Sequence, residues 1–322
     1  MAHFLLKSGL KLGMQRFGIG QPKKILLIHG WLDNSNSFNI LAPKLADNGY
    51  EATAIDILGH GHSDHAPLSS YNHFSHMVCH VKEVVDSMKE SNSNGKISIV
   101  GHSMGGAVAL MFASTYPELI DRLVMIESIG MVTKPAEDVV KTLRKGIEDI
   151  EKFDHTRIPK KVSMEVAVQA RVNAVTRYPG DQWISREAAY ELVKRGTITH
   201  EKNENDDFAS IVSFRYDRRL MNTSLVYFTP QQLNIFFESL ESEVLIILAD
   251  QGWPFSRTQH EKNRNILERK RLLTQIRLPG SHHLHLDKST ADATADAVGA
   301  FLTHGKNVIP SSNPIIPPAG NA

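Results

Sequence analysis

The pattern most suggestive of chemistry is the segment G-H-S-M-G at residues 101–105. It lies between an apolar run at 96–100, which predicts a strand, and a helical pattern over 104–116. A nucleophilic serine at a sharp strand-to-helix turn needs small residues two positions before and after it, because the turn is tight and its backbone strained. The two glycines of the segment meet that need. We therefore predict that Ser103 is a nucleophile, the alternative being an ordinary buried turn.

The elements around this turn alternate short apolar runs with amphipathic helical segments, a pattern typical of a parallel sheet covered by helices. Strands are predicted at 4–7, 10–17, 24–29, 51–57, 96–100, 122–126, 244–249 and 272–278. Helices are predicted at 37–48, 71–91, 104–116, 230–240 and 289–304. Between the sixth and seventh strands, helical periodicity continues at 137–153, 164–176 and 186–195 without a buried-strand pattern. The predicted class is therefore α/β, interrupted by a helical insertion.

The composition excludes several other classes of protein. Of 322 residues, 41% are hydrophobic and 22% are charged, as in ordinary globular domains. The 36 basic and 35 acidic residues leave a formal charge of +1, so no global field favours nucleic acid or an anionic membrane. The single cysteine, Cys79, excludes an intramolecular disulfide. No apolar stretch is long enough for a membrane span and no secretory leader is recognisable, so a cytoplasmic protein is expected, with an organelle left open.

Three motifs resemble those of the α/β-hydrolase fold, and the likeness extends from Phe4 to His304. They are H-G-W at 29–31, D-x-x-G-x-G-x-S at 56–63, and the serine turn at 101–105. The resemblance implies a mostly parallel central sheet with helices on both faces and a helical cap inserted after the sixth strand. It also implies an oxyanion hole made by the backbone N–H groups of Trp31 and Met104.

A general base is expected in the loop after the last strand, where three histidines compete. They lie in the segment P-G-S-H-H-L-H at 279–285. The family pattern resembled here aligns His282 with the base, and we predict that residue. His283 and His285 are then expected to serve packing or to lie at the surface, although sequence cannot decide the orientation of the loop.

The acid is where the chain departs from the commonest family pattern. In many members an aspartate lies a few residues beyond the strand that follows the cap, but here Gly252 stands near that place, next to Asp250. Some haloalkane dehalogenases of the same fold take the carboxylate from the end of the strand before the cap, which corresponds to Glu127. A carboxylate at either strand end can approach the histidine and stabilise its imidazolium. We predict Glu127, with Asp250 as second choice.

Within the fold, the chain most resembles the serine hydrolase-like (kraken) subfamily. The segments that carry this resemblance are H-G-W-L-D-N-S at 29–35, the serine turn, and P-G-S-H-H-L-H at 279–285. The expected division is a first core part at 1–130, a helical cap at 131–242, a second core part at 243–305 and an unstructured tail at 306–322. The cap should cover the sheet edge that presents Ser103.

The function predicted is that of a serine hydrolase of the carboxylesterase-like class, which cleaves a small ester or thioester through an acyl-enzyme. No cofactor, nucleic acid or membrane span is expected, and the oligomeric state is left open. A C–C bond hydrolase would use the same residues, and a ligand-binding protein could use the same scaffold. Aspartate nucleophiles, which dehalogenase and epoxide-hydrolase relatives use, are excluded by the serine at position 103.

A metal-dependent hydrolase is the strongest rival enzyme. The segment H-G-H-S-D-H matches the H-x-H-x-D-H spacing of zinc hydrolases with the metallo-β-lactamase fold and contains His60, His62, Asp64 and His65. Imidazole and carboxylate ligands suit zinc. The same residues are already explained by the glycine-rich turn, and the chain lacks the strand pattern of that fold. No metal site is therefore predicted.

Overall fold

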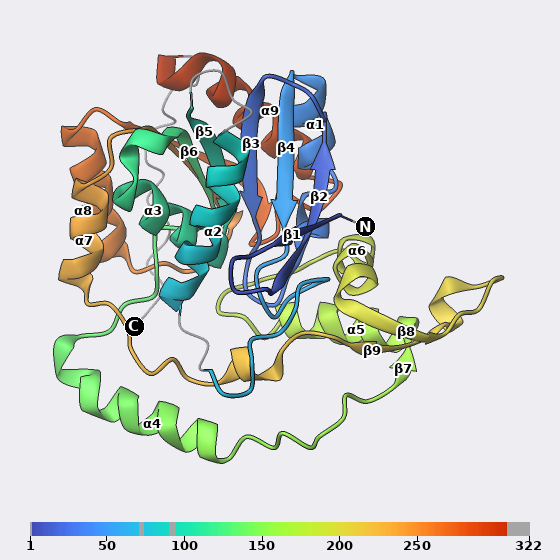
Figure 1. Cartoon of the computed structure of the whole chain (residues 1–322). Helices are drawn as coiled ribbons and strands as arrows, with labels where there is room; N and C mark the ends of the chain where they lie inside the picture. The colour runs from blue at the N-terminus through green and yellow to red at the C-terminus, as the bar shows by residue number, and fades with distance from the viewer. Residues whose placement is uncertain (1, 71–73, 90–94, 308–322) are drawn as a thin grey trace.

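A mostly parallel sheet forms the centre of the computed structural model, which describes residues 2–70, 74–89 and 95–307 (Figure 1). Within these residues the sheet has eight strands, in the spatial order β1 (Ala2–Leu5), β2 (Lys11–Phe17), β4 (Tyr50–Ile55), β3 (Lys23–Ile28), β5 (Ile97–His102), β6 (Ile120–Ile126), β10 (Glu243–Gln251) and β11 (Leu273–Ser281). Strands β1 and β2 pair antiparallel, as do β2 and β4, while the other neighbours are parallel. The predicted α/β class is confirmed.

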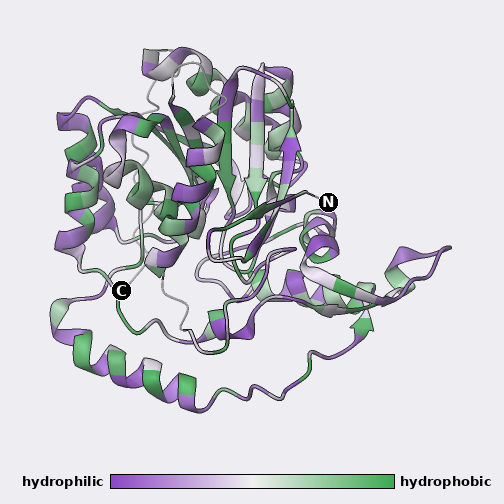
Figure 2. Ribbon diagram, viewed as in Figure 1, coloured by the Kyte–Doolittle hydropathy of each residue, from purple (hydrophilic) through white to green (hydrophobic). Residues whose placement is uncertain are grey.

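Helices cover both faces of the sheet because its inner strands are apolar on both sides. Every residue of β5 is buried, as are the last five of β3. One face packs against α1 (Leu41–Asp47) and α9 (Ala291–His304). The other packs against α2 (Phe74–Lys89), α3 (Met104–Thr115), α7 (Pro230–Glu238) and α8 (Arg257–Arg269). Figure 2 shows apolar strands inside and polar residues on the outer sides of these helices.

The insertion between β6 and β10 lies across the carboxyl ends of the parallel strands, at the bottom of Figure 1. Its regular elements are α4 (Val139–Glu151), β7 (Val162–Ser163), α5 (Met164–Val175), α6 (Arg186–Gly196), β8 (Thr197–Glu201) and β9 (Ile211–Phe214). The three short strands form a small antiparallel sheet that the sequence did not predict. They are two to five residues long and mostly half-buried or exposed, so they carry no buried apolar run.

Helix α7 follows the insertion and packs against α3 and α8 of the core. Its start is a capping box, in which Thr229 and Gln232 satisfy each other's backbone N–H groups, with Pro230 in the first turn. We propose that the cap ends near Thr229 and that α7 belongs to the core. Of the predicted tail, residues 306–307 form the end of a short 3₁₀ turn, and 308–322 lie outside the described residues.

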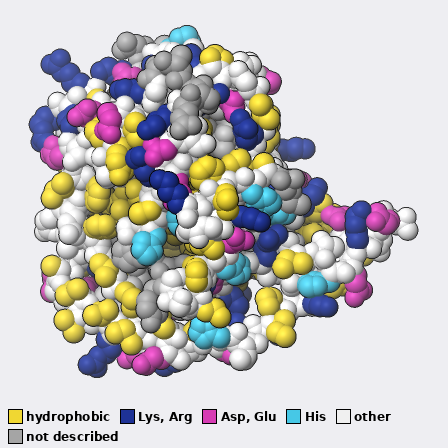
Figure 3. Space-filling model, viewed as in Figure 1, with side chains coloured by type: hydrophobic (Ala, Val, Ile, Leu, Met, Phe, Trp, Pro, Cys, Tyr) yellow, Lys and Arg dark blue, Asp and Glu magenta, His cyan; other side chains and the backbone are white. Residues whose placement is uncertain are grey.

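Helix α4 contacts the insertion near Thr223 and Leu225 and leaves other apolar side chains in solvent. Val139, Val140, Leu143 and Ile147 are 42–73% exposed. In Figure 3, apolar side chains gather at the lower left of this face, where α4 lies in Figure 1. No helix in the described part of the chain is long and apolar enough to cross a bilayer.

Two buried ion pairs attach the insertion to the core. Arg171 of α5 contacts the carboxylate of Asp33, which follows β3. Arg195 of α6 lies 2.8 Å from the carboxylate of Asp56, which follows β4. All four side chains are at most 9% exposed. Removing one partner of such a pair would leave a buried charge uncompensated, so these contacts fix where the insertion sits over the strand ends.

Candidate active site

Ser103 stands at the sharp turn between β5 and α3, with φ 51° and ψ −116°. The neighbouring glycines are required by space. A Cβ at Gly105 would come 2.0 Å from the carbonyl oxygen of Ile28, and one at Gly101 would come 2.4 Å from that of Gly105. The turn therefore holds the strained serine at the carboxyl edge of the sheet, where it lines a cavity.

His282 connects Ser103 to a carboxylate. Its Nε2 lies 2.9 Å from Ser103 Oγ, and its Nδ1 lies 3.0 Å from Glu127 Oε2. Because a carboxylate only accepts hydrogen bonds, Nδ1 carries the proton and Nε2 is free to accept one from the serine. The structure thus brings together the three residues that the sequence predicted, in the order serine, histidine, carboxylate.

The carboxylate of Glu127 occupies the space next to Gly252. Glu127 follows β6 with φ 48° and is 1% exposed. Its oxygens accept hydrogen bonds from the backbone N–H groups of Ala249 (2.6 Å) and Trp253 (2.8 Å). A Cβ at Gly252 would come 2.3 Å from Glu127 Oε1. The second-choice acid, Asp250, is exposed at the end of β10, whereas Glu127 is paired with the histidine.

Trp31 and Met104, the predicted oxyanion-hole residues, line the same cavity as Ser103. Met104 is the first residue of α3, so its N–H is among the amides that a helix leaves without an internal partner. Trp31 follows β3, and its indole N–H donates to the carbonyl of Leu220 (3.1 Å) in the insertion. The amide of Met104 lies at the positive end of the α3 dipole, next to Ser103, whereas that of Trp31 belongs to the loop after β3.

The other two histidines of the last loop have partners elsewhere. His283 Nε2 lies 3.3 Å from Asp33 Oδ2, and His285 Nε2 lies 2.6 Å from Ser37 Oγ. Both rings are at most 3% exposed. Burial lowers the pKa of His283 to about 3 and holds that of His285 well below its usual value. They pack in the interior, one of the two alternatives that the sequence left open.

Asp33 is the centre of a buried polar cluster next to the site. The sequence did not predict this cluster. Burial would raise its pKa, but Arg171 and then His283 hold that pKa well below the usual range. His102, the residue before the serine, donates from Nε2 to the carbonyl of His282 (2.8 Å), while its Nδ1 lies 3.6 Å from Asp33 Oδ2. These contacts join residues that are distant in the sequence, so no local pattern could have revealed them.

The buried histidines predict a protein that loses stability in mild acid. Burial lowers the pKa of both His60 and His283 to about 3. Between pH 6.5 and pH 3 the unfolded chain binds protons that the folded chain does not, so the free energy of unfolding decreases as the pH falls through this window. At pH 5 each of the two histidines is expected to contribute about 2 kcal/mol of destabilisation.

Urea unfolding at pH 7.5, 6 and 5 checks this prediction. The variant His283→Gln, which cannot gain a proton, should show a shallower decrease with pH than the wild type. The matched control is His200→Gln, because His200 is exposed and lies outside the buried cluster. It should leave the decrease with pH unchanged. A free energy of unfolding that is constant from pH 7.5 to pH 5 would contradict the prediction.

The rival zinc motif at 60–65 does not assemble as a metal site among the described residues. His60 is buried against His29, and Asp64 accepts from the backbone N–H of Lys11 (2.8 Å). His65 donates from Nε2 to the carbonyl of Arg215 (2.7 Å). In residues 2–70, 74–89 and 95–307, no three His, Cys, Asp or Glu side chains are grouped so that they could hold a metal ion.

The turn at 56–63 instead has a structural role. Asp56 accepts from the backbone N–H groups of Ser35 (2.7 Å) and His62 (2.8 Å), besides its contact with Arg195. A Cβ at Gly61 would come 2.4 Å from the Asp56 carboxyl carbon. The turn therefore folds around a buried carboxylate and connects the core to the insertion.

A strand-to-helix serine turn on this parallel sheet, with a histidine and a carboxylate from later strand ends, defines the α/β-hydrolase class. Residues 23–289 match the family described as alpha/beta hydrolase fold. The chain therefore belongs to this family, and within it to the serine hydrolase-like subfamily.

Individual relatives align along almost the whole chain. The chain is 28% identical to a serine hydrolase-like protein of Danio rerio, over 89% of this chain and 84% of the relative. It is 26% identical to serine hydrolase-like protein 2 of Homo sapiens, over 89% and 88%. A hypothetical protein of Pseudomonas aeruginosa PAO1 with a crystal structure is 31% identical, with a TM-score of 0.78 and coverage of 94% and 99%.

A further solved structure supports the fold alone. It is the thioesterase domain from the curacin biosynthetic pathway, which is 20% identical and has a TM-score of 0.71. The alignment covers 92% of this chain and 98% of that domain.

Proposed function

We propose that this protein is a serine hydrolase that cleaves a carboxylic ester or thioester of a small molecule through an acyl-enzyme. The observation that carries the proposal is the hydrogen-bonded series from Ser103 through His282 to Glu127 at the wall of a cavity. These residue types in this order can activate a serine at neutral pH. The names of the serine hydrolase-like relatives and of the thioesterase domain are consistent with it.

The proposed acyl transfer uses these residues in turn. His282 Nε2 takes the proton of Ser103 as Oγ attacks the carbonyl carbon, and Glu127 stabilises the imidazolium that forms. The amides of Trp31 and Met104 stabilise the developing oxyanion, where the loss of one donor costs about 10²- to 10³-fold in rate. The imidazolium then returns its proton to the leaving alcohol or thiol. Water, activated by the same histidine, releases the acid and restores the serine.

The proposed cap consists of residues 131–228 and closes one side of this cavity. Met221, Val226 and Tyr227 from the insertion line the same cavity as Ser103. Because these side chains share the cavity with the nucleophile, the cap can contact a substrate bound to Ser103. This contact therefore gives the insertion the role of substrate selection, separate from the acyl transfer performed by the core.

A fluorophosphonate probe tests the proposed function directly. Wild-type protein is expected to be labelled and to hydrolyse short p-nitrophenyl esters, with or without a zinc chelator, whereas Ser103→Ala should not be labelled. Activity abolished by the chelator but retained in Ser103→Ala would overturn the proposal. Folded protein with neither labelling nor turnover would favour a binding role on the same scaffold, and turnover confined to β-diketones would favour the C–C hydrolase.

A further inference from the structure

We propose that the site selects uncharged, largely apolar esters or thioesters and rejects anionic ones. This inference rests on the proposed function and names its substrate class. The observation behind it is the set of side chains that line the cavity at Ser103. This cavity has a volume of about 620 Å³. A cavity of this size matches those of small-molecule sites.

The side chains that face this cavity are mostly apolar and carry no positive charge. The apolar and aromatic residues are Trp31, Phe74, Met104, Ala107, Met131, Val132, Tyr178, Leu220, Met221, Val226, Tyr227, Phe228, Trp253 and Phe255. Among the described residues that line it there is no lysine or arginine, but there are two carboxylates, Asp33 and Glu127. An anionic substrate would lose its hydration without gaining a cationic partner, and Glu127 would repel it.

The mouth of the cavity is apolar as well. Val132, Met221 and Val226 line the cavity, yet they are 75%, 58% and 54% exposed. Large apolar side chains that are both exposed and part of a binding cavity favour a ligand that arrives with an apolar surface. The mouth of the cavity therefore favours apolar ligands, as its interior does.

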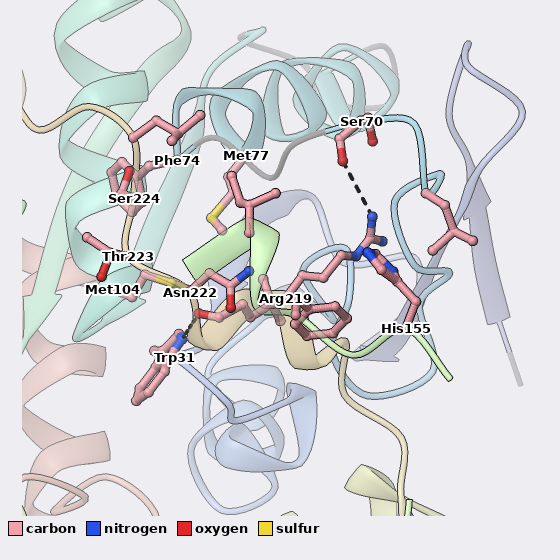
Figure 4. Close-up of a pocket in the computed structure, with 15 residues that line it drawn as sticks. Trp31, Ser70, Phe74, Met77, Met104, His155, Arg219, Asn222, Thr223 and Ser224 are labelled. Atoms are coloured by element: carbon pink, nitrogen blue, oxygen red, sulfur yellow. Dashed lines mark hydrogen bonds between the residues drawn. The ribbon is translucent and has the colours of Figure 1, made fainter. Parts of the chain in front are cut away.

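A second, smaller chamber of about 300 Å³, drawn in Figure 4, adjoins the first. The two chambers share seven lining residues, which are Trp31, Phe74, Met104, Leu220, Asn222, Thr223 and Ser224. Because Trp31 and Met104 also supply the proposed oxyanion amides, the scissile carbonyl lies near this boundary. The smaller chamber includes Arg219, but its guanidinium is paired with Asp217 and donates to the carbonyls of residues 66, 67 and 70. That charge is compensated, so the second chamber suits an uncharged group too.

A matched pair of esters tests the charge selection. In p-nitrophenyl octanoate the acyl chain ends in a methyl group, and in the p-nitrophenyl monoester of octanedioic acid it ends in a carboxylate. Octanoate is expected to have a kcat/KM about 100-fold above that of acetate, from the added methylene groups. The anionic ester should fall at least about 100-fold below octanoate. Equal kcat/KM for octanoate and the anionic ester would overturn the inference while the proposed function stands.

Substitution at the mouth adds a control for the place of binding. Val226→Trp should lower kcat/KM for octanoate at least 10-fold and for acetate less than 3-fold, because only the longer chain needs the space at the mouth. Val140→Trp makes the same change on α4, at a 73% exposed residue outside both chambers, and should change neither ester. Equal effects of the two variants would overturn the assignment of this cavity.

Binding to Ser103→Ala separates this inference from the proposed function. Trp31 and Trp253 line the cavity, so their fluorescence reports occupancy without turnover. The neutral ketone 2-decanone is expected to bind at least 30-fold more tightly than decanoate. If wild-type protein shows no ester turnover but this preference holds, the hydrolase proposal fails and the cavity assignment survives. Equal affinities for the ketone and decanoate would overturn the cavity assignment.

A different observation carries a second inference: we infer that Gln182 of the insertion is a positioning residue for the base. Its side chain is buried between the two loops that meet at His282 and Glu127. Oε1 accepts from the backbone N–H of His282 (3.0 Å), and Nε2 donates to the carbonyls of Gly252 (2.7 Å) and Pro179 (3.2 Å). One amide thus connects the loop that carries the base with the loop that binds the acid.

The residues next to Gln182 strengthen this connection. The carbonyl of Trp183 accepts from the hydroxyl of Ser281, and the indole of Trp183 donates to Gln251 (2.9 Å). Because these contacts come from the insertion, the base reaches its place only with the insertion seated on the core. A misplacement of about 1 Å at the base is enough to cost up to about 100-fold in rate.

The isosteric variant Gln182→Met tests this role, since it keeps the volume and removes the hydrogen bonds. We expect kcat for acetate to fall at least 10-fold with KM within 2-fold, and the rate of fluorophosphonate labelling to fall in parallel. Gln169→Met, on the exposed side of α5, is the matched control and should change neither. A lower Tm with unchanged kcat and labelling rate would show a merely structural role. If wild-type protein is not labelled at all, the proposed function fails first. In that case unaltered ring chemical shifts of His282 in Gln182→Met, measured at one pH, would overturn the positioning role.

Discussion

Replacing Ser103 with alanine is expected to lower kcat for ester hydrolysis by about 10⁴- to 10⁶-fold. The reason is that neither His282 nor Glu127 can substitute for the lost Oγ, and the remaining catalysis comes only from the oxyanion amides and binding. Hydrolysis of p-nitrophenyl acetate, followed with purified wild-type and variant protein, measures the effect. Circular dichroism and Tm establish that the variant is folded. Residual kcat within 10-fold of the wild type would contradict the role of Ser103.

The backbone at Ser103 offers an independent check on the same turn. Its φ of 51° and ψ of −116° are strained for any residue with a Cβ, so Ser103→Ala retains that strain. Ser103→Gly removes it and should raise Tm by about 2 °C relative to Ser103→Ala, because about 1 kcal/mol of strain is relieved. Both variants should be inactive. A pair of equal Tm values would mean that the turn relaxes in solution and does not strain the serine.

The parts of this site that sequence could predict are those with a local signature. The glycines at 101 and 105 are needed because atoms of the first turn of α3 and of β3 stand where their Cβ atoms would be. The order of strands and helices could be predicted from the sequence because strands buried on both faces are continuous apolar runs. The small sheet of the insertion was missed because its strands lack such runs.

Other features depend on how distant segments meet, and no local pattern carries them. The choice of His282 over its neighbours is fixed by the course of a loop that Gln182 holds from a segment 100 residues away. The pairing of Asp33 with Arg171 spans 138 positions. In each case the partner is supplied by the insertion, whose placement on the core follows from tertiary contacts alone.

Replacing Glu127 with glutamine is expected to lower kcat for ester hydrolysis by about 10³- to 10⁴-fold. The amide keeps the shape of the side chain but cannot stabilise the imidazolium, and it favours the wrong tautomer of His282. Asp250→Asn is the matched control and should change kcat by less than 3-fold, because that side chain is exposed at the end of β10. The two variants, assayed with the same ester, decide which acid operates. A large loss in Asp250→Asn alone would overturn the assignment of Glu127.

The space shared by Glu127 and Gly252 allows a stronger test, in which the acid is moved. In the wild type a side chain at 252 would collide with the Glu127 carboxylate, so Gly252→Asp alone should be poorly active. Glu127→Gly empties that space and also suits the φ of 48° at position 127. Adding Gly252→Asp to Glu127→Gly should recover at least 10-fold in kcat, because a carboxylate returns to the side of His282 Nδ1. Recovery would show that the site requires a carboxylate at one place in space, which either strand end can supply. A double variant no better than Glu127→Gly would mean that the backbone N–H groups of Ala249 and Trp253 must also hold the carboxylate.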